Sequence, residues 1–278
     1  MANLLSVKKI YCDTKFKRND SKSNSNFKID LPQTLKLPDN CVFYIDDVSI
    51  PNSFYTVELN INDKLYFRLQ LSSGGTFTDY IVILDSKTYN GVQFTAEMQS
   101  KITAITSGTA TACTYDSQSK NMSVSVSNFD INFFTDAELQ SLTTWNGTAY
   151  NSNNLQSANE LITNTSLPSP VGNTAIPAKF YLMLTPVRNI YMRSPNLSSF
   201  NTIGCNGESN IVKKIPVNAP PGEMITSYIT SSTDYLDCSG ATWKTIEIQI
   251  QDVNGNEISL HGVNWSFSIL LSIGNPNI

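Results

Sequence analysis

Apolar and polar residues alternate over many short segments, and this period of two constrains the fold more than any other feature. Residues 27–31 alternate up to Pro32, and residues 246–250 repeat the pattern near the C-terminus. Successive side chains of a strand point to opposite faces, so each such segment predicts a strand that is buried on one face. Further strands are predicted at residues 42–50, 65–71, 111–115, 122–126, 180–184, 258–260 and 265–273.

Turn residues between these segments indicate local pairings. We expect a hairpin from residues 59–61 into residues 65–71, because Asn62 and Asp63 lie between them. Residues 111–115 and 122–126 are expected to pair across a polar turn, and residues 252–256 are expected to form another turn. Residues 80–84 are almost continuously apolar and therefore predict a central strand.

Two segments depart from the strand pattern. Apolar residues within 92–105 recur at helical spacing, which predicts a short amphipathic helix. Thr135 is followed three residues later by Glu138, the signature of a capping box at the start of a second helix. Both helices are expected between strands.

These elements together predict an all-β fold. About eight antiparallel strands without alternating helices indicate a single jelly-roll β-sandwich with two short helices. Residues 1–25 are interpreted as a basic N-terminal arm, and residues 26–278 as one domain. Two long polar loops, 145–177 and 196–243, are rich in Asn, Ser and Thr and are candidates for an outward insertion.

Charge is scarce and unevenly distributed. Charged residues make up 15% of the chain, the formal net charge is −4, and Ser, Thr and Asn supply about a third of all residues. This balance disfavours nucleic-acid binding by the folded body and suits close packing against other copies. Six cations crowd the N-terminal segment and could contact nucleic acid or an acidic partner: Lys8, Lys9, Lys15, Lys17, Arg18 and Lys22.

The sequence offers no obvious reactive centre. His261 is the single histidine, and the five cysteines are too widely spaced for a zinc site, so neither a metal nor a cofactor is expected. The chain shows no catalytic motif, and we expect no enzymatic activity. An odd number of dispersed cysteines fits a reducing compartment, and no apolar run is long enough to cross a membrane.

Several phrases, in order along the chain, resemble penton proteins of virophages and polinton-like viruses. They are NSNFKIDLP (24–32), DDVSIPNSFY (46–55), YNGVQF (89–94), FFTDAEL (133–139), IEIQIQDVNG (246–255) and LHGVNWSF (260–267). The resemblance implies a single jelly roll, assembly into homopentamers, and contacts with a double jelly-roll major capsid protein at the five-fold vertex of a virion. It also implies assembly inside the host cell. It does not specify whether a receptor or a spike protein binds at the outer loops.

Three rival functions remain at this point. A glycan-binding or receptor-binding module would use exposed aromatic residues in the polar loops, with Trp145, Tyr150 and Trp243 as the platform. Another minor capsid component, such as a cement protein, is the nearer alternative. A hydrolase with a scattered site has only the versatility of jelly rolls in its favour.

Overall fold

The computed structural model divides the chain into two compact units, each with its own core. It describes residues 6–71, 74–107, 111–151, 155–163, 178–197, 202–204, 207, 209–228 and 234–273. Unit 1 comprises residues 1–54 and 187–278, and unit 2 comprises residues 55–186. Unit 2 is therefore an insertion between two halves of unit 1 in the sequence.

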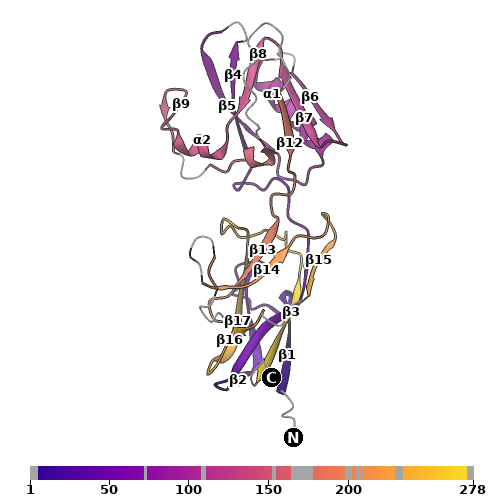
Figure 1. The fold of residues 1–278 in the computed structure, drawn as a ribbon, viewed down its shortest axis with the longest axis vertical. Coiled ribbons are helices and arrows are strands. Elements are labelled where there is room, and N and C mark those ends of the chain that lie inside the picture. The colour runs from indigo at the N-terminus through magenta and orange to yellow at the C-terminus, as the bar shows by residue number, and fades with distance from the viewer. Residues whose placement is uncertain are drawn as a thin grey trace. The chain divides into compact units, whose positions relative to one another are not determined.

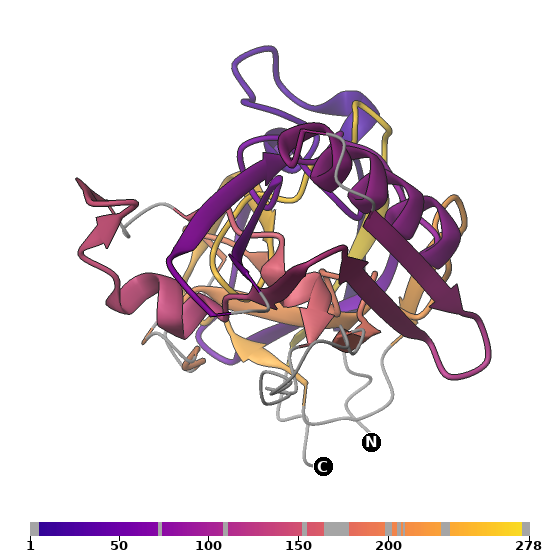
Figure 2. The same cartoon turned by 90° about the horizontal axis from the view of Figure 1, so that it is seen from above.

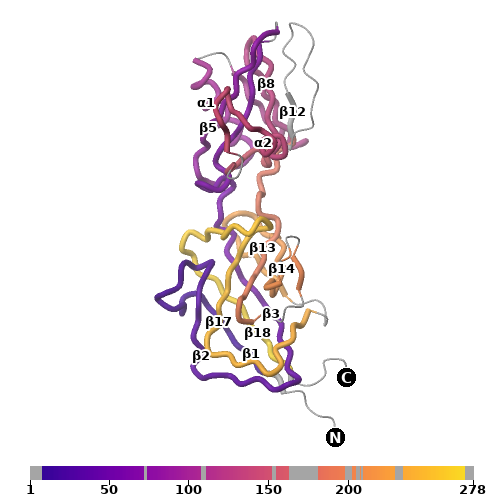
Figure 3. Tube along the Cα trace, turned by 90° about the vertical axis from the view of Figure 1, so that its left-hand side faces the viewer, coloured from indigo at the N-terminus to yellow at the C-terminus, as the bar shows by residue number. Residues whose placement is uncertain are grey.

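Unit 1 is a sandwich of two antiparallel sheets (Figure 1). The first sheet has the order β1 (Ser6–Asp13), β18 (Ser266–Ile273), β3 (Cys41–Pro51) and β15 (Met224–Tyr228), and β16 (Leu236–Asp237) also pairs with β3. The second has the order β14 (Ile211–Pro216), β13 (Asn189–Arg193), β17 (Thr242–Gln251) and β2 (Asn26–Lys36). Strands from the two chain ends, β1 and β18, run side by side (Figure 3).

The alternating apolar residues of both sheets meet in one core. Phe27 of β2 is fully buried, and its ring lies edge-on to that of Trp265 with the centroids 5.5 Å apart. Ile246, Ile248 and Ile250 of β17 are also fully buried. Inward-facing residues of two stacked sheets form such a core, and the predicted single jelly-roll sandwich is confirmed.

Unit 2 is built on a larger antiparallel sheet made mostly of local pairings. Its order is β11 (Ile162–Thr163), β12 (Ala178–Leu182), β7 (Asn121–Val126), β8 (Phe129–Phe133), β4 (Lys64–Leu71) and β5 (Phe77–Ile83), and β6 (Thr111–Asp116) pairs with β7. The remaining elements are η2 (Asn159–Leu161) and a two-stranded ribbon of β9 (Thr144–Trp145) and β10 (Thr148–Ala149).

Unit 2 also contains two capped helices (Figure 2). Helix α1 (Gly91–Ile105) begins at a capping box of Asn90 and Gln93 and buries Phe94, Met98 and Ile102 against the sheet. Helix α2 (Asp136–Ser141) begins at the predicted box, in which the Glu138 N–H donates to Thr135 Oγ1 at 3.2 Å. Both predicted helices are confirmed.

The domain organisation differs from the expected arm and single domain. Residues 6–13 are strand β1, and η1 (Thr14–Phe16) follows, so the described part of the N-terminal segment belongs to the sandwich. The insertion is residues 55–186; of the expected 145–177 loop, residues 152–154 and 164–177 lie outside the described residues. The expected 196–243 loop contributes β14, β15 and β16 to unit 1, although residues 198–201, 205, 206, 208 and 229–233 are not described.

Four local predictions were wrong. The strand predicted at residues 258–260 is absent, and this segment follows an isolated bridge at Glu257. Residues 59–61 form a turn rather than a hairpin strand, because the Asn62 side chain bonds to the backbone of Glu58 and Thr56. Strand β5 lies at the end of its sheet order rather than in the centre. Pro32 does not end β2, which continues to Lys36 past an irregularity in its register with β17, where the missing proline N–H is tolerated.

The chain leaves unit 1 near Asn52 and re-enters it near Arg188, and both points form hydrogen bonds to one segment. The Asn52 side-chain amide donates to the Ala219 carbonyl oxygen at 2.8 Å, and the Val217 N–H donates to the Arg188 carbonyl oxygen at 2.9 Å. Residues 217–219 therefore hold both ends of the insertion within unit 1.

Candidate functional site

The basic N-terminal residues were the candidate contact site, and half of them are paired within the fold. Lys9 of β1 forms ion pairs with Asp46 and Asp47 of β3, the latter at 3.2 Å. The hydrogen bond to Asp46 raises the pKa of Lys9. Lys22 forms an ion pair with Glu257 at 3.0 Å. These contacts attach the segment to the rest of unit 1.

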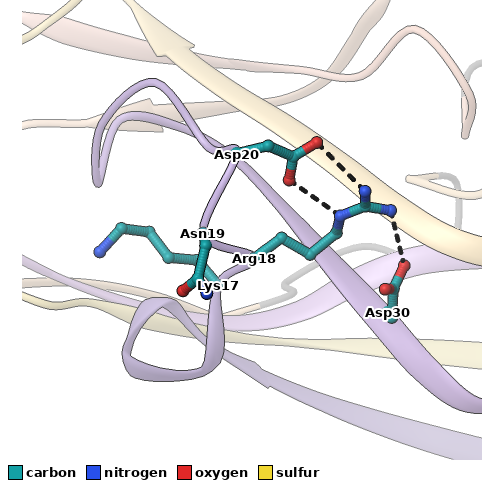
Figure 4. Close-up of a pocket in the computed structure, with 5 residues that line it drawn as sticks. All are labelled: Lys17, Arg18, Asn19, Asp20 and Asp30. Carbon is teal, nitrogen blue, oxygen red and sulfur yellow. Dashed lines mark hydrogen bonds and ion pairs between the residues drawn. The ribbon is translucent and has the colours of Figure 1, made fainter.

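Arg18 lies beside a shallow surface pocket lined by Lys17, Arg18, Asn19, Asp20 and Asp30 (Figure 4). Its guanidinium donates two hydrogen bonds to Asp20 (2.9 and 3.1 Å) and one to Asp30 (3.3 Å). The bond from Arg18 lowers the pKa of Asp20, and bonds from Thr245 and Arg18 lower that of Asp30. Two carboxylates thus balance the two cations, so the pocket is poorly suited to binding an anion.

The other three cations remain available for contact. Lys8 and Lys15 are exposed, and Lys17 points away from the Arg18 guanidinium (Figure 4). None of these three side chains forms an ion pair with any residue that the structure describes. Ion pairing within the described residues therefore distinguishes two groups. Lys9, Arg18 and Lys22 are paired, and Lys8, Lys15 and Lys17 are not.

The aromatic platform of the rival glycan-binding hypothesis is not assembled. Trp243 lies in β17 of unit 1, only 3% exposed, with its ring edge-on to Phe43. Trp145 and Tyr150 belong to unit 2, where their rings stack with centroids 5.6 Å apart and are half-buried against Tyr66. The rival hypothesis requires Trp243 to be exposed if it is to bind a sugar, and its burial excludes it from that role.

The groups that could support chemistry are dispersed. His261 lies in a turn with a positive φ of 50°, away from any strand. Burial raises the pKa of the Cys12 and Cys113 thiols to about 12, which makes them weak nucleophiles at neutral pH. Within the described ranges, no group of His, Cys, Asp or Glu residues could hold a metal ion. No helix among those residues is long and apolar enough to span a membrane.

Sequence reasoning missed a surface at the two edges of the first sheet of unit 1. Tyr11 on β1 is 78% exposed, and Tyr228 and Met224 on β15 are 68% and 48% exposed. Among the described strands, β1 pairs only with β18 and β15 pairs only with β3. Residues 224–228 (MITSY) do not alternate regularly and follow a Pro-Pro-Gly turn, so their strand left little signal in the sequence.

Comparison with known proteins identifies the architecture. The crystal structure of the mavirus penton protein superposes with a TM-score of 0.53 at 11% sequence identity, over 96% of this chain and all of that one. The chain shares the fold of that penton protein. The cryo-EM structure of the Sputnik virophage gives a TM-score of 0.49 at 14% identity, over 96% of this chain and 98% of that one. No family model and no curated protein matches the sequence.

Proposed function

We propose that this chain is a structural capsid protein, the penton subunit that closes the five-fold vertex of an icosahedral virion as a homopentamer. The observation that carries the proposal is the shared fold with a penton protein over nearly the whole length of both chains, insertion included. The order of sequence phrases that resembles virophage pentons supports it independently.

Both edges of one sheet offer surface for contact between identical copies. A ring requires two different faces of each subunit, one that meets each neighbour. The β1 edge presents Tyr11 and the β15 edge presents Met224 and Tyr228. Exposed apolar side chains on open strand edges favour association with another chain. We assign the subunit contact in the ring to these two edges.

The proposal is tested first by the oligomeric state of the purified chain. Native mass spectrometry and negative-stain images should show a five-membered ring, either for the chain alone or after addition of its double jelly-roll major capsid protein. A monomer over the whole accessible concentration range, with and without that partner, would contradict the assignment.

The edge assignment is tested by charge substitution at a single exposed position. Tyr228→Asp should raise the dissociation constant of the pentamer about tenfold or more, since a carboxylate would be desolvated in the contact. Val253→Asp is the matched control, because Val253 is exposed in the 252–256 turn, which follows β17 of the other sheet. Equal assembly of both variants would place the contact elsewhere on the chain.

The unpaired cations form the second proposed contact. Lys8, Lys15 and Lys17 would meet neighbouring capsid subunits, or a genome beneath the vertex, as particles assemble inside the host cell. A triple Lys→Ser variant should still form rings but should enter particles at reduced yield. Normal incorporation of that variant would remove these residues from the assembly contacts.

A further inference from the structure

Two cysteines far apart in the sequence face each other in unit 1. Strand β16 pairs antiparallel with β3, with Leu236 opposite Phe43 and Asp237 opposite Val42. One more step along this register places Cys238 opposite Cys41, and the Cys238 N–H donates to the Cys41 carbonyl oxygen at 3.0 Å. The Cys238 thiol donates to the same oxygen at 3.3 Å, and the two thiols are close enough to affect each other's pKa.

This arrangement matches the geometry of a disulfide. Residues directly opposite on antiparallel strands have Cα atoms about 4.5–5.5 Å apart, inside the range that a disulfide requires. The Cα separation therefore permits the bond, and small adjustments would bring the two Cβ atoms to the separation of about 3.8 Å that a disulfide has. The other described cysteines, Cys12 and Cys113, form no hydrogen bond to a thiol in the part of the chain that the structure describes.

We propose that Cys41 and Cys238 are an oxidisable pair that a disulfide oxidant converts into a covalent link between β3 and β16. With oxidised glutathione, the Cys238 thiolate attacks one glutathione sulfur and releases the first reduced glutathione. The Cys41 thiolate then attacks the mixed disulfide at the Cys238 sulfur and releases the second. Two electrons and two protons thus pass from the cysteines to the oxidant.

Accessibility decides which thiol reacts first. Cys238 is 6% exposed and directly follows a two-residue strand, whereas Cys41 is fully buried at the start of β3. Local opening of so short a strand exposes Cys238 before it exposes Cys41. Burial raises the pKa of both thiols, so the reaction should be slow at neutral pH and faster in alkaline buffer.

The consequence is a disulfide bond whose formation depends on the redox conditions around the chain. The pair stays reduced in a reducing cell and closes in an oxidising medium. The link would join positions 197 residues apart and so constrain the unfolded chain strongly. The proposal concerns unit 1 alone and holds whether or not the chain forms a vertex.

The test is oxidation of the full chain with oxidised glutathione at alkaline pH, followed by intact mass and peptide mapping. We expect a mass lower by two hydrogen atoms, two of the five thiols lost, and a cross-linked peptide pair containing Cys41 and Cys238. The Tm should rise by about 5 °C or more and should return to its initial value after reduction.

Variants separate this pair from other thiols. Cys41→Ala should leave Cys238 as a mixed disulfide with glutathione, while Cys113→Ala should cross-link like the parent chain. The mapping on the parent chain does not depend on how the variants fold. Retention of all five thiols, or a cross-link of either cysteine to Cys205, would overturn the proposal.

Discussion

The two units are both antiparallel, but they assemble from different kinds of contact. In unit 1 the central pairings join residues from opposite ends of the chain, such as β1 with β18 and β2 with β17. In unit 2 most pairings join neighbours in the sequence, such as β6 with β7 and β4 with β5. Pairing strands that are far apart in the sequence closes a longer loop, and this has a larger entropic cost. Unit 1 therefore depends on both ends of the chain, whereas unit 2 contains all of its own strands.

Removal of the last strand should produce the largest difference between the units. Strand β18 lies between β1 and β3, so a chain that ends at residue 264 loses the centre of one sheet of unit 1. Unit 1 should become sensitive to protease, while a fragment spanning residues 55–186 should survive. Limited proteolysis with mass mapping checks this. Equal loss of both units would show that unit 2 cannot stand without unit 1.

Matched core truncations test whether the two units unfold separately. Phe27 in unit 1 and Phe67 in unit 2 are both fully buried. Each change to Ala should cost about 3–5 kcal/mol in its own unit, because it removes apolar contacts and leaves a cavity. Hydrogen exchange should show lowered protection only in the unit that carries the change. Phe16→Ala, at an exposed position, is the control and should cost about 0.5 kcal/mol or less.

A buried ion pair of unit 2 contrasts with the exposed ion pairs that Arg18 forms in unit 1. Arg68 donates to both oxygens of Asp79 at 2.6 and 3.1 Å, and the Asp79 side chain is only 5% exposed. Arg68→Met should destabilise unit 2 by about 2 kcal/mol, since it leaves a buried carboxylate without its partner. Arg18→Met should have no measurable effect, because both partners of Arg18 are exposed. Denaturant unfolding of both variants measures the contrast.

A half-buried carboxyl should give unit 2 a small dependence on pH. Burial raises the pKa of Asp136 above its ordinary 3.8, so the folded state holds this proton more tightly than the unfolded state does. Protonated Asp136 therefore contributes to the free energy of unfolding below pH ~4. That contribution is lost as the pH rises through the pKa of Asp136 in the folded state.

Asp136→Asn removes this titration from unit 2. The variant should be more stable than the parent at neutral pH by less than about 1 kcal/mol, because solvent screens a group that is partly exposed. The difference should vanish in acid. Thermal unfolding of the two proteins at several pH values measures it, and a gap that does not change with pH would contradict the proposed role of Asp136.

The sequence was most informative where the structure is local. The turn between β6 and β7 and the capping box at Thr135 were predicted from a few adjacent residues, and both are present. In unit 1 only β2, β3, β17 and β18 were predicted, and their pairing partners were not, because alternation specifies which face is buried and not which strand lies beside it. The division into two units was missed for the same reason.

The candidate site was predicted only in part. Charge clustering found Lys8 to Lys22, but it did not reveal that Lys9 is paired with Asp46 and Asp47, since those residues lie on another strand. The proximity of Cys41 and Cys238 could not be predicted, because their approach depends on β16, a strand of two residues with no detectable period.

The anchoring of Asn52 and Arg188 to residues 217–219 has an evolutionary consequence. Unit 1 itself fixes the two points between which unit 2 is inserted. The entropic cost of closing that loop therefore changes little with the length of the inserted chain. Such a scaffold can accept a replacement module of another size or shape while keeping its own strand pairings. The insertion is then the part of the chain that is free to diverge, whereas the sandwich must keep the strand pairings that hold it together.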